Sequence, residues 1–241
     1  MMNKIAYFIS DAHLGIEPPG CKPNREDALI EFLHLVRDSA SHVVIVGDLF
    51  EFWYEYRDYV SKHHFPLFFA LADLVNAGVE VHLLRGNHDF AMEGFFETMG
   101  VHVHSKLQLE IQGKKIYMAH GDGVIKSDWS YRLYRKILDF PLDRFLFRQL
   151  HPDWGMALAR FVGRNSRKLG ENKEIRIDEY LQWASACLKK FGCDLCIHGH
   201  HHIPGIWNVD GGIVASPGEW IKKFTFLQME KGELSLKSFK D

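Results

Sequence analysis

The sequence has little of what marks several large classes of protein. Only four of its 241 residues are cysteine, too few for the dense pattern of a disulfide-stapled secreted domain. No apolar run approaches the ~20 residues that a membrane-spanning helix needs. The formal net charge is −2, so the basic excess of a dedicated nucleic-acid binder is missing. We therefore expect no transmembrane helix and no nucleic-acid partner.

The first residues also lack the pattern of a targeting signal. After Met1 and Met2 there is no cationic stretch followed by an apolar run and a small-residue cleavage site. Cys193 and Cys196 form a C-x-x-C, but no second cysteine pair exists to complete a zinc site. We interpret the pair as reduced core thiols at a turn between a helix and a strand. These features predict a cytoplasmic protein.

The length allows one large domain, or one domain with an insertion, and the hydrophobic pattern predicts an α/β fold. Strands are expected at residues 5–10, 42–46, 79–84, 107–111, 115–119 and 195–198, and helices at 24–39, 59–76 and 175–190. Open α/β sheets bind their ligands beyond the carboxyl ends of the strands. Polar residues directly after the predicted strands are therefore the first candidates for a functional site.

Histidine is abundant, with 15 residues, and several histidines follow predicted strands. Five polar blocks each come after an apolar run: Asp11-x-His13, Gly47-Asp48, Gly86-Asn87-His88-Asp89, His120-Gly121-Asp122 and Gly199-His200-His201-His202. Carboxylate and amide oxygens mixed with imidazoles suit divalent Mn, Fe or Zn. A bridging carboxylate can hold two such ions ~3.5–4 Å apart, where they clamp a phosphoryl group. A single block is often a plain turn, but five in order at strand ends predict a two-metal phosphoesterase.

The five blocks resemble those of the calcineurin-like metallophosphoesterase family over nearly the whole chain. The resemblance implies a four-layer α/β/β/α sandwich of two facing sheets. It also implies two sets of metal ligands that share one bridging carboxylate. These are Asp11, His13, Asp48 and His202 for the first metal, and the bridging Asp48 with Asn87, His120 and His200 for the second.

The same resemblance implies a catalytic pair. His88 would hydrogen-bond the phosphate and either stabilise developing charge or protonate the leaving group. Asp89 would orient the ring of His88, as carboxylates commonly fix imidazole tautomers. Two other histidines flank the ligands. His198 is expected just behind the ligand shell and His201 is expected to point away from the site.

Three segments resemble, more narrowly, the bacterial UDP-2,3-diacylglucosamine diphosphatases of lipid A synthesis: Ser10–Gly15, Gly47–Trp53 and Gly218–Trp220. This resemblance implies two divalent ions, with Mn²⁺ first and Fe or Zn as alternatives. A metal-bound hydroxide would attack the α-phosphorus of UDP-2,3-diacylglucosamine and release UMP and 2,3-diacylglucosamine 1-phosphate. The implied contacts to this acylated UDP-sugar are Asn87, His88, Asp128, Ser166, Asn172, Lys173 and His200.

Two departures bear on the substrate. The best-known members of that group have Arg at the position of His88 and Asn at the position of Gly170, although Asn172 is close. His88 instead matches the catalytic histidine of the broader metallophosphoesterase family. This favours an alternative, a generic metal-dependent phosphodiesterase or nucleotidase acting on a soluble substrate. A protein-binding scaffold on the same fold is expected to lose metal ligands, whereas all seven implied ligands are present here.

Residues 129–170 interrupt the strand–helix alternation with an aromatic and basic segment. It contains nine Lys or Arg against three Asp, a net +6 in a chain of −2. Solvated faces of ordinary helices are one interpretation. We favour an inserted helical cap for a lipid substrate, between two parts of a metallophosphoesterase core at residues 1–128 and 171–241. Its cations would meet the diphosphate or the inner face of the cytoplasmic membrane, giving a peripheral association.

Other conspicuous residues have structural interpretations. His63 and His64 are expected at a solvated helix start, and His102 and His104 on the outer face of a strand. The aromatic run at residues 50–56 fits a core segment and a ligand cradle about equally, because it directly follows the bridging carboxylate.

Overall fold

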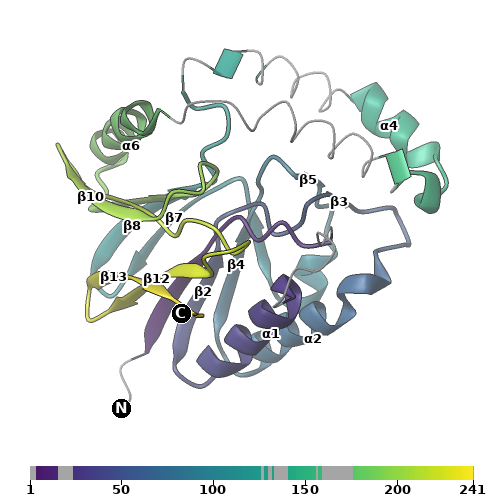
Figure 1. The fold of residues 1–241 in the computed structure, drawn as a ribbon, viewed down its shortest axis with the longest axis horizontal. Coiled ribbons are helices and arrows are strands. Elements are labelled where there is room, and N and C mark those ends of the chain that lie inside the picture. Colours follow the sequence, from purple (N-terminus) through teal and green to yellow (C-terminus); the bar gives the residue numbers. More distant parts are fainter. Residues whose placement is uncertain are drawn as a thin grey trace.

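The computed structural model describes residues 4–15, 24–125, 128–129, 132, 141–155, 157–158 and 176–240. Within these residues two β-sheets lie face to face (Figure 1). The first sheet comprises, in spatial order, β13 (Glu233–Ser238), β12 (Thr225–Glu230), β1 (Ile5–Ile9), β2 (Ala40–Ile45), β4 (Glu80–Leu84) and β6 (His102–His104). The second comprises β10 (Gly205–Val209), β11 (Gly212–Ser216), β9 (Leu195–His198), β8 (Lys114–Ala119) and β7 (Lys106–Ile111).

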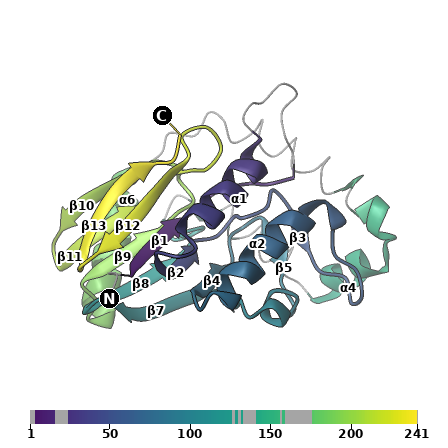
Figure 2. The same ribbon diagram turned by 90° about the horizontal axis from the view of Figure 1, so that it is seen from below.

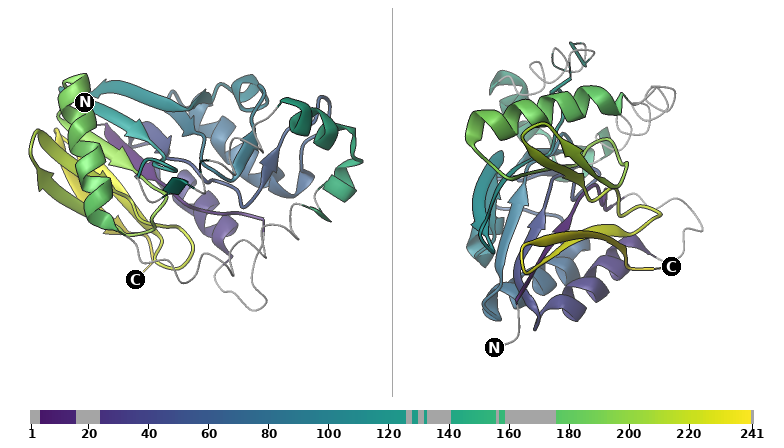
Figure 3. Two further views of the ribbon diagram at one scale, coloured as in Figure 1. Left: turned by 90° about the horizontal axis from the view of Figure 1, so that it is seen from above. Right: turned by 90° about the vertical axis from the view of Figure 1, so that its left-hand side faces the viewer.

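Helices cover the outer faces of both sheets (Figure 3). Their bounds are α1 (Arg25–Val36), α2 (Phe65–Asn76) and α6 (Ile177–Phe191), with short 3-10 helices η1 (Lys62–His64) and η2 (Phe96–Met99). One apolar cluster, around Phe32 and Leu71, lies between the first sheet and α1 and α2. A second, around Phe8 and Met118, fills the space between the sheets, and a third lies between α6 and the second sheet. The predicted α/β/β/α layering is confirmed.

Parallel strands form the centre of each sheet. In the first sheet β1, β2, β4 and β6 are parallel, and the antiparallel β12–β13 hairpin extends the edge beside β1. In the second sheet β8, β9 and β11 are parallel. The carboxyl ends of neighbouring parallel strands therefore lie at one edge of each sheet, where the predicted ligand blocks begin.

Local sequence signals explain where the helices begin. Asn24 caps α1, because its side chain accepts a hydrogen bond of 3.0 Å from the backbone N–H of Glu26. The helix expected from Tyr59 instead begins at Phe65, with Pro66 in its first turn, where a missing N–H costs nothing. No helix in the described part of the chain is both long and apolar enough to cross a membrane.

A small two-stranded sheet, β3 (Trp53–Tyr54) with β5 (Asp89–Ala91), carries the described helix of the predicted cap, α4 (Pro141–Gln149). Figure 2 shows α4 beyond β3 and β5, away from the main sheets. The Phe147 ring of α4 lies 5.8 Å from that of Phe52 and 4.6 Å from that of Tyr54. Part of the aromatic run thus holds α4. The cap boundaries at 129 and 170 stay predictions.

The histidines outside the polar blocks differ in whether their observed exposure matches the expectation. His63 is exposed, as expected, but the expectation of a solvated His64 is wrong. The His64 ring is buried, with its Nδ1 2.9 Å from Glu26 Oε2 and its centroid 4.7 Å from that of Phe50. His102 is exposed and His104 half-buried on the edge strand β6.

Candidate metal centre

The five polar blocks meet beyond the strand ends. Asp11 and His13 follow β1, Asp48 follows β2, Asn87 and His88 follow β4, His120 follows β8, and His200 and His202 follow β9. Both sheets therefore contribute to one site, which explains why the ligand blocks are spread over 192 positions of sequence, from 11 to 202.

The backbone at the predicted ligands is unusual. Eight described non-glycine residues have positive φ, and five of them are predicted ligands: Asp11 (53°), His13 (46°), Asp48 (52°), His200 (73°) and His202 (60°). A non-glycine residue in this region costs roughly 1–3 kcal/mol and persists where the surroundings over-determine it, typically at functional sites. The turns bring these side chains to a common centre at the expense of local stability.

Two glycines make room for the ligands. A Cβ built on Gly47 would lie 2.4 Å from His120 Nδ1, and one on Gly86 would lie 2.1 Å from Asp48 Oδ1. Both contacts are far shorter than any real Cβ makes, so neither position accepts a side chain without displacing a predicted ligand. Both positions therefore require glycine because the ligand side chains pack too closely for a Cβ. Gly47 has a second reason, since its φ of 90° is one that residues with a side chain rarely adopt.

A first group of ligand atoms comes from Asp11, His13 and His202. Asp11 Oδ1 lies 3.3 Å from His202 Nε2 and 3.8 Å from His13 Nε2. The two Nε2 atoms are 3.3 Å apart. These three side chains can direct one ligand atom each at a single ion.

A second group comes from Asp48, His120 and His200, with Asn87 beside it. Asp48 Oδ2 lies 3.2 Å from His120 Nε2, and Asn87 Oδ1 lies 3.2 Å from the same nitrogen. Asp48 Oδ2 is also 3.7 Å from His13 Nε2 in the first group. The Asp48 carboxylate is thus placed between the two groups, where a bridging ligand has to be.

The donor set fits two divalent ions. Ligand atoms bound ~2.0–2.2 Å from a common ion lie ~2.8–3.6 Å apart, close to the separations found here. Asp11 Oδ1 is buried and makes no hydrogen bond, although a buried carboxylate oxygen normally has a partner. An ion at the centre of the first group would satisfy this oxygen.

The electrostatics of the site also call for positive charge. Burial opposes the ionised forms of Asp11 and Asp48, yet neighbouring imidazoles hold the pKa of both carboxyl groups well below the usual range. Burial likewise opposes protonation of His13, but its contacts with Asp11 and Glu51 raise its pKa to about 10. A ligating imidazole is neutral, so a metal ion would replace such protons as the counter-charge.

Glu51 is a site residue that the sequence analysis missed. Its carboxylate is buried, with Oε2 3.3 Å from His13 Nδ1 and Oε1 3.9 Å from His88 Nδ1. Its backbone carbonyl accepts a hydrogen bond of 2.7 Å from His88 Nδ1. Glu51 therefore positions both rings. The available signals were its place three residues after Asp48, inside an aromatic run, and its place within the Gly47–Trp53 segment that carries the narrower family resemblance.

Asp89 differs from its expected role. Its Oδ2 accepts hydrogen bonds from the backbone N–H groups of Asp48 (2.9 Å) and Gly86 (3.0 Å), while His88 bonds to Glu51. Asp89 thus fixes the two loops that carry ligands and does not orient the His88 ring. Burial, followed by the nearby charge of Asp48, raises the pKa of Asp89 to about 7.

Buried groups behind the ligands fix their orientation. His120 Nδ1 donates to the carbonyl of Val46 at 2.8 Å, which leaves Nε2 for the centre. Ser10 Oγ donates to Asp11 Oδ2 at 2.5 Å. His198 and His201 are both buried, and their rings lie 4.8 Å apart. Neither belongs to any of the groups of possible ligands in the described chain, which are the two groups above and a third made by His13, Glu51 and His88.

The predicted substrate contacts in and near the cap divide into two sets. Ser166, Asn172 and Lys173 lie outside the described residues. Asp128 is half-buried, and its backbone N–H donates to Ile125 O at 3.3 Å.

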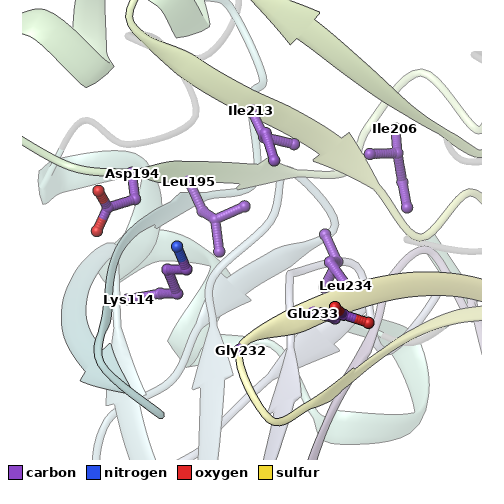
Figure 4. Close-up of a pocket in the computed structure, with 8 residues that line it drawn as sticks. All are labelled: Lys114, Asp194, Leu195, Ile206, Ile213, Gly232, Glu233 and Leu234. Carbon is purple, nitrogen blue, oxygen red and sulfur yellow. The ribbon is translucent and has the colours of Figure 1, made fainter.

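A separate pocket of about 360 Å³ includes none of the predicted site residues. It is lined by Lys114, Asp194, Leu195, Ile206, Ile213, Gly232, Glu233 and Leu234 (Figure 4).

The chain matches known proteins along nearly its whole length. The model of the calcineurin-like phosphoesterases matches residues 6–204. A curated UDP-2,3-diacylglucosamine hydrolase of Porphyromonas gingivalis is 32% identical over 266 residues, covering 100% of this chain and 99% of its own length. One of Aeromonas salmonicida is 30% identical, covering 95% and 91%. A solved structure described as an archaeal phosphodiesterase has a TM-score of 0.51 at 14% identity, covering 97% of this chain and 98% of its own, which supports the fold alone.

Proposed function

The chain belongs to the calcineurin-like phosphoesterase family, and we propose that it hydrolyses UDP-2,3-diacylglucosamine to UMP and 2,3-diacylglucosamine 1-phosphate. The observation that carries the proposal is the extent of the match. The two curated hydrolases align with this chain over 91% or more of their own lengths. Such a match extends well beyond the metal-binding blocks. A likeness limited to those blocks would support only a phosphoesterase of unspecified substrate.

Under this proposal the two groups of side chains hold two divalent ions. The ligands are Asp11, His13, Asp48 and His202 for one ion, and Asp48, Asn87, His120 and His200 for the other. Bound ions of this kind polarise a phosphoryl group and make water acidic enough to attack at neutral pH. Mixed oxygen and imidazole donors suit Mn²⁺, with Fe and Zn as alternatives.

His88 is proposed to act on the phosphoryl oxygens. Its Nδ1 donates to Glu51 O, so Nε2 is the nitrogen left for the substrate. The ring lies edge-on to that of His13, with centroids 4.7 Å apart, and therefore borders the first ligand group. When protonated, Nε2 can donate a hydrogen bond to a phosphoryl oxygen or pass its proton to the leaving oxygen.

The cap offers a surface for the acyl chains. Leu142, Phe145 and Leu146 of α4 are 54%, 58% and 54% exposed, although apolar side chains of this size gain by leaving water. Phe147 of the same helix packs on Phe52, four residues after the bridging carboxylate. This ring contact connects the helix that carries the proposed lipid surface to the segment that follows the bridging carboxylate. Its apolar side chains, with the basic excess of the segment, also support peripheral association with the inner face of the cytoplasmic membrane.

Substitutions on α4 test the lipid assignment without removing a buried side chain. Phe145→Gln and Leu146→Gln should lower kcat/KM for UDP-2,3-diacylglucosamine and leave a small activated phosphodiester unaffected. Burying one such side chain is worth ~1.5–3 kcal/mol, which corresponds to a loss of roughly tenfold to a hundredfold. Leu35→Gln is the control, because Leu35 is 71% exposed on α1, outside the cap. Equal losses on both substrates would contradict the assignment.

One observation favours a second candidate function. His88 is the histidine that a general phosphodiesterase or nucleotidase needs, and such an enzyme requires no lipid surface. This alternative predicts that a soluble nucleotide or diester is turned over efficiently while the acylated sugar nucleotide is not. Competition between the two substrates in one reaction separates the alternatives directly.

A further inference from the structure

Three histidines outside the metal centre lie together at one edge of the first sheet. His82 is on β4, His102 and His104 are on the edge strand β6, and the strand register pairs His82 with His102. Residues two apart on a strand point to the same face. The three rings accordingly form a triangle. Their centroids are separated by 5.3 Å (82–102), 5.4 Å (82–104) and 6.5 Å (102–104).

Two of these rings already have the spacing of metal ligands. His82 Nδ1 lies 3.3 Å from His104 Nε2. Nitrogens bound ~2.0–2.1 Å from a tetrahedral ion are ~3.3–3.4 Å apart. A hydrogen bond between the rings would give a similar distance, so the spacing alone does not decide between a metal site and a hydrogen-bonded pair.

The other nitrogen of His82 favours the metal. The His82 ring is 5% exposed, and its Nε2 is buried and makes no hydrogen bond. Glu80 Oε2 lies 3.8 Å from this Nε2. If Nδ1 binds an ion, the ring proton sits on Nε2, on the side of the Glu80 carboxylate. A side-chain movement of Glu80 that closes the 3.8 Å gap would then form the hydrogen bond usual behind a metal-ligating histidine.

The protonation state also suits a ligand. Burial, followed by the charges of neighbouring histidines, lowers the pKa of His82 to about 4. Burial also lowers the pKa of His104, against the opposing charge of Glu97. Both rings are therefore neutral at neutral pH, and an ion that binds them does not have to displace a proton.

We propose that His82, His102 and His104 form a second metal-binding site, separate from the catalytic centre, for a divalent ion that prefers imidazole, with Zn²⁺ as its representative. His82 and His104 supply the preset pair. The three side chains do not present one nitrogen each within ligating distance of one another in this arrangement. The site therefore requires the exposed His102 ring to rotate toward the His82–His104 pair. Imidazole suits Zn, Cu and Ni, and a fourth position is left to water. An ion held here joins β6 to β4 and stabilises the sheet edge.

The experiment measures Zn²⁺ stoichiometry by equilibrium dialysis and elemental analysis, on the full chain. We expect the parent to bind one more equivalent of Zn²⁺ than His104→Asn or His102→Asn. Loss of a residue that hydrogen-bonds a metal ligand typically lowers metal affinity ~10–100-fold. Loss of a ligand itself should lower the affinity for this additional Zn²⁺ by more than that. The control is His63→Asn, because His63 is an exposed histidine of η1 outside the cluster. The control should bind as the parent does.

A second measurement is the rise in Tm on adding Zn²⁺. The catalytic ligands are intact in every variant, so the difference between parent and variant reports the second site alone. Turnover of a small phosphodiester with Mn²⁺ verifies that each variant is folded. If His104→Asn does not fold, His102→Asn decides, because its side chain is exposed. Equal stoichiometry in the parent and the folded variants overturns the proposal, as does an equal loss in His63→Asn.

Discussion

Replacing Glu51 by Gln tests how the metal centre is supported. The Glu51 carboxylate is 3% exposed and lies 3.3 Å from His13 Nδ1, so its charge acts on a ligand ring with little solvent between them. A hydrogen bond to a charged group contributes ~1.5–3 kcal/mol. Gln retains an oxygen that can accept the same hydrogen bond and removes only the charge. We therefore expect a loss in the lower part of that range, roughly tenfold in metal affinity.

The assay is turnover of a small phosphodiester as a function of Mn²⁺ concentration. Glu51→Gln should shift the Mn²⁺ midpoint upward about tenfold and leave kcat at saturating Mn²⁺ nearly unchanged. The rate is spared because His88 bonds to the backbone carbonyl of residue 51, which the substitution keeps. A lowered kcat with an unchanged midpoint would refute the reasoning, since it would place the Glu51 side chain in the chemical step.

Glu55→Gln is the matched control for this experiment. Glu55 is equally buried, but its carboxylate accepts hydrogen bonds from Trp53 Nε1 at 3.1 Å and from the backbone N–H groups of Glu93 and Phe95. Its substitution should lower the free energy of unfolding and leave the Mn²⁺ midpoint in place. A similar midpoint shift in both variants would attribute the effect to general loosening of the fold.

Three further predictions concern single side chains. Asp48→Ala should lose both bound metals by elemental analysis and nearly all turnover, because the proposed bridge is gone; turnover within roughly tenfold of the parent would contradict the assignment. His88→Ala should keep its metal and lose ~10²–10³ in kcat, so metal loss would move His88 into the ligand set. Burial lowers the pKa of His82 to about 4 in the folded protein, so the unfolded chain takes up this proton at a higher pH than the folded protein does. The free energy of unfolding is therefore unaffected by His82 above pH ~6.5 and falls as the pH drops toward 4. In urea unfolding with chelator, the free energy of unfolding should therefore fall less between pH 7 and pH 4 in His82→Gln than in the parent, and an equal fall in both would contradict this reasoning.

The α/β class and the ligand blocks were predictable because both depend on local patterns, whereas the four-layer arrangement was implied by the family resemblance. A buried strand such as β1 is a short apolar run, and the polar residues Asp11 and His13 must follow it at the sheet edge. The parallel order of β1, β2 and β4 then brings the blocks of the first sheet together without any knowledge of distant contacts.

Long-range contacts were not predictable in this way. Glu51 acts on His13 and His88 across 38 and 37 positions of sequence, and nothing in the run around it distinguishes it from Glu55. His64 is buried by its pairing with Glu26, which no local pattern indicates. The role of Asp89 depended on whether its carboxylate reached a ring or two backbone N–H groups, and only the folded loops decide this.

The most direct test of the proposed function is hydrolysis of UDP-2,3-diacylglucosamine in ¹⁸O-labelled water. The purified chain is incubated with Mn²⁺, and both products are identified by mass spectrometry. Attack of water on the α-phosphorus predicts UMP that carries one ¹⁸O atom, together with unlabelled 2,3-diacylglucosamine 1-phosphate. Label in the lipid phosphate would contradict the site of attack. Absence of UMP at saturating Mn²⁺, with a small phosphodiester still turned over, would contradict the lipid substrate itself.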